Sequence, residues 1–372
     1  MSTDGGNKKE PLYYGDYLQI GKLLDAQHLE SSKIGATAHD EMLFIIVHQA
    51  YELWFKQILW EMDAVKRLFS GPVMEEKALG KGVAHLERIV EIQRLFSTQI
   101  DILETMTPLD FLDFRDALFP ASGFQSAQWR LIENTFGLRP QDRYQYNKTK
   151  YSARLSASDR DRVEEVEQSE SIFDLVQEWL ERTPFIRLGD FDFWSEYGNA
   201  VDVMLGHDRT LIDGNPLLSD QEKIDQLENL KKTTDHFAAL FDVDAYAKLI
   251  ADGSHRLSHR ALKAALLIHL YRDEPILHTP FRFLKSLVDM DENFSAWRYR
   301  HALMVARMIG TKIGTGGSSG HEYLLRAAEH NKVFSDLTNL STFFIPRSVL
   351  PALPANIARQ MGFRFSPDDS DS

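Results

Sequence analysis

TAHDEMLFIIVHQAYELWFKQILWEMD, residues 37–63, is the stretch that decides the fold. Its apolar residues recur at the spacing of an α-helix, at Phe44, Val47, Tyr51, Phe55, Ile58, Leu59 and Met62. The opposite face carries Ile45, Trp54 and Trp60, which predicts a helix buried on most sides. His48 lies within the first apolar stripe. It is either a satisfied core residue, with Glu52 one turn away as a partner, or a functional group.

The composition limits the classes of protein to consider. The chain has 372 residues, 43% of them hydrophobic, which is enough for one large domain or two modest ones. Lys and Arg number 42 against 55 Asp and Glu, so the net charge is −13. Binding to nucleic acid needs clustered basic residues that displace counterions, and this acidity argues against it.

The chain contains no cysteine. This excludes disulfides, zinc–thiolate sites, iron–sulfur clusters and cysteine nucleophiles. Residues 1–11 are polar and lack the apolar core of a signal peptide, and no apolar run approaches the roughly 18 residues of a membrane span. We therefore expect a soluble, cytoplasmic protein without a membrane segment.

Nearly the whole chain has the pattern of helices. An N-terminal arm leads into a short helix over 12–24, and 139–156 reads as a loop. Further helices are expected over 37–71, 73–106, 110–119, 125–136, 172–182, 257–271, 281–290 and 294–309, followed by two more before a Pro-rich, acidic tail. There are no repeats and no convincing period-2 strands, so the predicted class is all-α, with a large helical bundle.

The predicted organisation has five parts. Residues 1–36 are a tail and arm, 37–183 and 256–350 form the two parts of the helical core, and 351–372 are a C-terminal tail. Residues 184–255 mix acidic and basic runs, as in SDQEKIDQLENLKKTTDH, and are expected to form an inserted helical subdomain with a solvated outer face.

Arg115 is the most informative charged residue. Its helical neighbours at i±3 and i±4 are all apolar: Phe111, Leu112, Leu118 and Phe119. A buried guanidinium needs an anion, because leaving it unpaired costs several kcal/mol. That anion is either a carboxylate from a distant helix or a ligand carboxylate held by the two parallel hydrogen bonds that arginine can donate.

His301 is the second candidate. It lies on an apolar stripe with Trp297, Met304, Val305 and Met308, and Arg298 stands one turn before it. A nearby cation disfavours protonation, so we expect a neutral imidazole, the form that a metal or haem iron requires. A lone histidine on an apolar face is more often a core residue than a ligand, and no HExxH motif or His/Asp/Glu triad accompanies it.

Two further features are weaker indications of a functional site. The loop GTGGSSG, residues 314–320, lacks the ending of a phosphate-binding loop, and is either a flexible connector or a loop whose amides and Thr315 or Ser318 hydroxyls close over a polar ligand. His255 and His259 stand at i, i+4 as a possible metal pair, but two arginines adjoin them and no third ligand is evident.

Four segments together resemble the tryptophan 2,3-dioxygenase family: FIIVHQAYELWFKQILWEMD, LETMTPLDFLDFRDALFPASGFQS, the tripeptide WRY before His301, and GTGGSSG. The resemblance runs from about residue 13 to 346. It implies an all-α homotetramer that binds haem b, one per chain and ferrous when active. Such enzymes insert both atoms of O2 across the indole C2–C3 bond of L-tryptophan, giving N-formylkynurenine in the kynurenine pathway.

The resemblance also implies roles for residues. His301 matches the axial haem ligand, His48 the distal catalytic histidine and Arg115 the carboxylate-binding arginine. Thr315 matches a threonine near the substrate ammonium and carboxylate. The remaining matches are pocket residues Phe44, Tyr51 and Phe111, haem-surrounding residues Ser122, Arg130, Trp297 and Tyr323, and Tyr14 and Tyr17, which reach into a neighbouring subunit's site.

The sequence departs from the family in places and leaves alternatives. Phe111 stands where some bacterial members carry a tyrosine, His321 where animal members have tyrosine, and Arg300 where animal members have asparagine. Competing readings are an indoleamine 2,3-dioxygenase, a haem-binding sensor or carrier without turnover, and a helical scaffold without a cofactor. Residues 185–255 resemble the family least.

Overall fold

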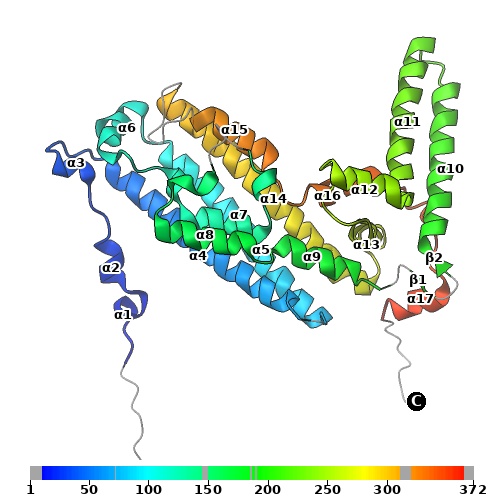
Figure 1. The fold of residues 1–372 in the computed structure, drawn as a ribbon, viewed down its shortest axis with the longest axis horizontal. Coiled ribbons are helices and arrows are strands. Elements are labelled where there is room, and N and C mark those ends of the chain that lie inside the picture. Colours follow the sequence, from blue (N-terminus) through cyan, green and yellow to red (C-terminus); the bar gives the residue numbers. More distant parts are fainter. Residues whose placement is uncertain are drawn as a thin grey trace, which may run out of the picture.

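Three long helices form the centre of the computed structural model, which describes residues 11–71, 73–144, 150–184, 187–188, 191–310 and 320–363. These helices are α4 (Glu41–Phe69), α5 (Glu76–Leu103) and α14 (Pro275–Ile309). α5 packs against both α4 and α14, while α7 (Ala127–Phe136) covers α4 and α15 (Gly320–His330) covers α14 (Figure 1). The predicted all-α bundle is confirmed.

Shorter elements complete the described part of the chain. The helices are α1 (Tyr14–Leu18), α2 (Ile20–Leu24), α3 (Glu30–Lys33), α6 (Pro108–Arg115), α8 (Ala157–Gln168), α9 (Ile172–Glu181), α10 (Phe193–Gly214), α11 (Asp220–Phe241), α12 (Val243–Ala251), α13 (His259–Leu270), α16 (Ser335–Thr338) and α17 (Ala355–Gln360). Two-residue strands β1 (Arg187–Leu188) and β2 (Phe191–Asp192) pair antiparallel. Short 3₁₀ turns cover 116–118, 123–125, 140–142, 151–154 and 339–343.

α4 is buried or half-buried around most of its circumference, as predicted, and this includes Ile45 and Trp54 but not Trp60. Its inner stripe, including Val47, Phe55 and Met62, lies in the core. Its outer face carries Ile46, Leu53 and Trp60, with spacings of seven residues, and the side chain of Trp60 is 67% exposed. α5, α7 and α9 pack against α4 but none of them covers this stripe, so an apolar outer face stays uncovered within one chain.

The prediction of separate helices over 281–290 and 294–309 is wrong. α14 is continuous from Pro275, with Pro280 in its second turn. The polar residues between the two apolar runs, 291–293, include neither Pro nor Gly and do not break the helix, and the side chain of Asp291 is turned inward. Its carboxylate accepts hydrogen bonds from the backbone N–H groups of Val333 and Phe334, each at 2.9 Å.

Residues 193–251 form a helical protrusion. α10 and α11 pack against each other as a hairpin that stands away from the central bundle (Figure 1). Phe193, Tyr197 and Val201 are buried at its base, where the Tyr197 hydroxyl donates a hydrogen bond to the Phe343 carbonyl, while most of α11 is solvated. The predicted division into five parts stays a prediction.

The two ends of the described chain differ. The N-terminal arm breaks at Gln19, whose φ of 53° separates α1 from α2. Tyr14 and Tyr17 are 76% and 69% exposed, so their rings do not pack onto their own chain. Within the predicted C-terminal tail, in contrast, α17 buries Ile357, and the Met361 carbonyl accepts a hydrogen bond from the Ile276 N–H at 3.1 Å.

Candidate active site

A cavity of about 310 Å³ lies between α4, α5, α6, α7, α14 and α15. This volume is at the lower end of the range, roughly 300–1,000 Å³, that holds small molecules and cofactors. Ten of the predicted site residues line it: Phe44, His48, Tyr51, Phe111, Arg115, Ser122, Arg130, Trp297, His301 and Tyr323. Segments far apart in the sequence therefore converge on one chamber.

His48 projects into the cavity from α4. Its Nδ1–H donates to the Phe44 carbonyl at 2.7 Å, because a carbonyl only accepts. Burial lowers the pKa of His48, and the Phe44 carbonyl opposes that shift less strongly. A neutral ring protonated on Nδ1 leaves Nε2 as a hydrogen-bond acceptor. Glu52 accepts from the Gln128 side-chain amide at 2.8 Å, and its effect on the pKa of His48 is a small upward one that burial outweighs.

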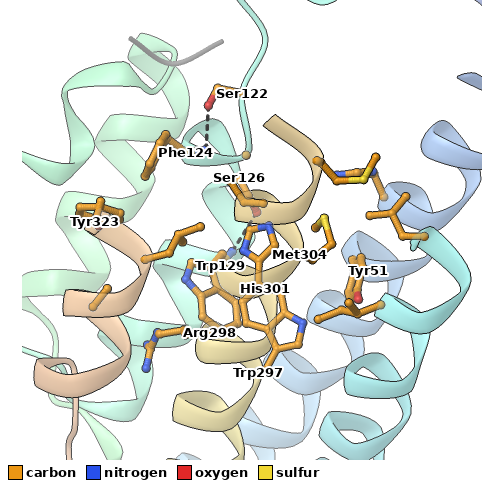
Figure 2. Close-up of a pocket in the computed structure, with 18 of the residues that line it drawn as sticks. Tyr51, Ser122, Phe124, Ser126, Trp129, Trp297, Arg298, His301, Met304 and Tyr323 are labelled. Carbon is orange, nitrogen blue, oxygen red and sulfur yellow. Dashed lines mark hydrogen bonds between the residues drawn. The ribbon is translucent and has the colours of Figure 1, made fainter. Parts of the chain in front are cut away.

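His301 reaches the cavity from α14 (Figure 2). Burial, with a smaller contribution from His48, lowers its pKa to about 4. The predicted neutral imidazole is confirmed, but its cause is desolvation rather than the neighbouring Arg298. Within the described part of the chain, the buried Nδ1 has no hydrogen-bond partner. Such a group costs roughly 1–3 kcal/mol unless something binds the ring.

Aromatic rings form the floor beneath His301. The Trp297 ring stacks on the His301 ring, and its centroid lies 4.6 Å from that of Trp129. Tyr51 closes one side, where burial raises its pKa to about 12 and its hydroxyl donates to the Phe96 carbonyl at 2.7 Å. Together with Met304, which lies on the same side of His301 as Tyr51 in Figure 2, these groups make a largely apolar chamber suited to a planar, largely apolar cofactor.

A buried cluster of charges forms another wall. The Glu133 carboxylate accepts from Arg130 at 2.9 Å, from Arg298 at 2.9 Å and from Arg143. Burial alone would raise the pKa of Glu133, but attraction to the three guanidinium groups holds it well below its ordinary value. Three cations around one carboxylate leave positive charge beside the cavity, which favours an anionic group such as a carboxylate on the ligand.

Arg115 is the last residue of α6, a helix whose start is fixed in the sequence. Pro108 occupies its first turn, and Thr107 and Asp110 cap it reciprocally, with the Thr107 N–H donating to the Asp110 carboxylate at 2.8 Å. Phe111, one turn before Arg115, lies 5.8 Å from the Phe44 ring. α6 thus places the Arg115 guanidinium at the cavity wall, next to the aromatic rings of Phe111 and Phe44.

The remaining predicted site residues are two tyrosines that do not line this cavity and a threonine that the structure does not describe. Tyr14 and Tyr17 lie on the exposed arm, and Thr315 with most of GTGGSSG lies outside the described residues. His255 and His259 do not form a metal pair, since they face the carbonyls of Ser254 and Leu240. Across the described ranges, no group of three or more His, Asp or Glu side chains could hold a metal ion.

Sequence reasoning missed several lining residues. Glu133, Trp129 and Glu52 line the cavity, and Arg143 supports it from behind through Glu133. Glu133 sits in an ordinary amphipathic helix, RLIENTF, and nothing in its spacing sets it apart from a surface carboxylate. Its partner Arg130 stands one turn before it, a pairing that is also typical of a solvated helix surface, and the other two arginines, Arg143 and Arg298, come from separate segments.

The fold and the cavity define the class: an all-α protein with two neutral histidines and an arginine on one apolar chamber. The family model described as Tryptophan 2,3-dioxygenase matches residues 1–344. The chain is 53% identical to the tryptophan 2,3-dioxygenase of Bdellovibrio bacteriovorus over 96% of this chain and 100% of that protein. It is 43% identical to that of Mus musculus over 98% of this chain and 89% of that protein. The chain belongs to the tryptophan 2,3-dioxygenase family.

A third relative, the tryptophan 2,3-dioxygenase of Alteromonas mediterranea, is 48% identical over 95% of this chain and 98% of that protein. The agreement thus extends across nearly the full length of bacterial and animal relatives. In the part of the chain that the structure describes, no helix is long and apolar enough to cross a membrane.

Proposed function

We propose that this protein is a haem-dependent dioxygenase that converts L-tryptophan and O2 to N-formylkynurenine. The observation that carries the proposal is the convergence of His48, His301 and Arg115 on one apolar cavity. Membership of the family supplies the reaction, and the geometry supports a role for each of these three residues.

The residues around His301 fit a haem, of which we propose one b-type group per chain. His301 offers a neutral, buried ring, which is the state that ligates iron. Ser122, Arg130, Trp297 and Tyr323 would surround the macrocycle, with Arg130 beside its propionates. Bound ferrous haem would supply the iron chemistry that activates O2.

The protein's own groups bind and orient the substrate. The Arg115 guanidinium would hold the substrate carboxylate by two charge-assisted hydrogen bonds, with Thr315 near the ammonium group. Nε2 of His48, left as an acceptor, would receive the indole N–H. Phe44, Tyr51 and Phe111 would pack against the indole ring and exclude water. Fixing both ends of the substrate sets the C2–C3 edge toward the reacting oxygen.

We further propose that the active form is a homotetramer whose sites are completed by exchanged arms. The exposed rings of Tyr14 and Tyr17 support an arm that packs onto another copy. The exposed apolar stripe of Ile46, Leu53 and Trp60 on α4 supports a second contact surface between copies.

An absorption spectrum of the purified, reduced protein, followed by addition of L-tryptophan in air, tests the proposal. We expect a haem spectrum and stoichiometric formation of N-formylkynurenine with consumption of one O2 per substrate. A haem spectrum without product would favour a sensor or carrier, and the absence of haem binding would overturn the proposal.

A further inference from the structure

A bidentate ion pair between Arg300 and Glu104 joins α14, which carries His301, to the end of α5, which leads into α6 and Arg115. The Arg300 guanidinium donates two hydrogen bonds to the Glu104 carboxylate, from Nη2 at 2.8 Å and from Nη1 at 3.1 Å. Arg307 lies 3.8 Å from the same carboxylate. Glu104 is therefore held between two arginines of α14 that flank His301 in sequence.

Glu104 also stands at the end of α5, close to the start of α6. It is the C-cap of α5, and its N–H donates to the Ile100 carbonyl at 2.9 Å. Only Thr105 and Met106 separate it from Thr107, the N-cap of α6. Both connecting residues are fixed by backbone hydrogen bonds to the last turn of α5, and Met106 is buried against the cavity. A shift of Glu104 would therefore move α6 with it.

We propose that Glu104 and Arg300 are positioning residues that fix the distance between the carboxylate anchor on α6 and His301 on α14. The inference rests on the proposed function, since it assigns the pair an effect on L-tryptophan binding. Neither side chain lines the cavity, so both act through Arg115 and Phe111 on one side and His301 on the other.

The physical basis is the geometry and shielding of the pair. The side chain of Glu104 is 12% exposed, and a bidentate pair with one shielded partner is stronger than an ordinary surface ion pair. Arg300 also donates a hydrogen bond to Asp101, one turn earlier on α5, at 2.5 Å, but that carboxylate is 62% exposed and solvent screens the pair. A small displacement of Arg115 weakens its two hydrogen bonds to the substrate carboxylate, while His48 still orients the indole end, so the main effect falls on binding.

The same two helices supply a matched control. Arg282 of α14 and Glu87 of α5 form an ion pair at 2.6 Å, and both partners are about half exposed. This pair lies toward the other ends of the helices and neither residue lines the cavity. It joins the same elements but has no connection to α6.

The test compares Glu104→Gln, Arg300→Met and the double variant with Glu87→Gln and Arg282→Met in the haem-loaded, full-length protein. KM and kcat for L-tryptophan are measured together with haem content and thermal midpoint. We expect KM to rise about fivefold in Glu104→Gln and in Arg300→Met, while kcat and haem content stay nearly unchanged. Because the two residues act as one pair, KM of the double variant should be no higher than that of either single variant. Arg300→Lys should recover part of the loss, and the control pair should leave KM unchanged.

Three results would overturn the inference: an unchanged KM in Glu104→Gln and Arg300→Met, an equal rise in the control pair, or strictly additive effects in the double variant. If Glu104→Gln does not fold, Arg300→Lys and Arg300→Met still decide between these outcomes. Failure of the unaltered protein to form N-formylkynurenine would overturn the proposed function instead, and would be seen before any variant is compared.

Discussion

The ring of Trp297 lies stacked on the ring of His301, with centroids 5.4 Å apart and planes inclined by 18°. The two residues are one turn apart on α14, so the helix itself sets this arrangement. Trp297 is packed in turn against Trp129, Phe55 and Phe96, which leaves the imidazole little freedom to rotate. The ring that we propose as the haem ligand is thus held in place by its neighbours.

Replacing His301 with alanine should abolish stable haem binding. The variant removes the imidazole that we assign to the iron and opens the floor of the cavity. The measurement is the haem content and ferrous absorption spectrum of the purified variant. His330→Ala, which removes an exposed histidine from α15, is the control and should retain both. Full haem occupancy in His301→Ala with an unchanged ferrous spectrum would show that another group is the ligand.

Arg115→Leu should weaken the binding of L-tryptophan while leaving haem content nearly intact. Losing a charge-assisted bidentate pair costs about 2–5 kcal/mol, or roughly 30-fold to several-thousand-fold in affinity. The measurement is the apparent affinity from substrate-induced changes in the haem spectrum. Arg162→Leu, which removes a surface ion pair on α8, should have no effect. An affinity equal to that of the unaltered protein would remove Arg115 from the substrate site.

His48→Ala should lower activity without eliminating it. One hydrogen bond from the indole N–H to Nε2 is worth about 0.5–1.5 kcal/mol, which corresponds to a loss of roughly two- to tenfold. Steady-state kinetics with L-tryptophan measure this directly. Complete loss of turnover in a variant that still binds haem and substrate would instead identify His48 as an obligatory base.

Glu133→Gln should destabilise the protein at neutral pH and much less in acid. The folded-state pKa of Glu133 is depressed from 4.5, so its contribution is present above that value and is lost as the pH falls through the folded pKa. Removing the charge from among three buried arginines costs about 3–5 kcal/mol. Denaturant unfolding at pH 7 and at successively lower pH measures the difference. If the difference in unfolding free energy between Glu133→Gln and the unaltered protein does not become smaller as the pH falls, this account is wrong.

Mixing two inactive variants should restore activity if the sites are shared between chains. One carries Arg115→Leu, and the other carries Tyr14→Ala with Tyr17→Ala. Some sites in a mixed oligomer then combine an intact Arg115 pocket with an intact arm from the other chain. The measurement is N-formylkynurenine formation after proven subunit exchange. A fully active monomer, or no recovery despite exchange, would show that the arm does not complete the site.

The sequence by itself determined the helices and the main residues of the cavity. Apolar spacing fixed the inner stripe of α4, and the Thr107–Pro108–Asp110 signal placed the start of α6, because both depend on residues within a few positions of each other. The same local reasoning placed His301 on an apolar stripe. The match to the family motifs then predicted that Phe44, Arg115 and Tyr323 belong to one site.

Tertiary structure alone decided how these groups are partnered and charged. Desolvation keeps His301 neutral, and desolvation depends on what packs around a residue rather than on the cation nearest in sequence. Asp291 interrupts an apolar pattern yet lies inside a continuous helix, since its partners, Val333 and Phe334, are contributed by a segment some forty residues later. Glu133 has Arg130 on its own helix, but Arg143 and Arg298 reach it from distant segments. Spacing along one helix carries no information about such contacts, because they form only when separate helices pack together.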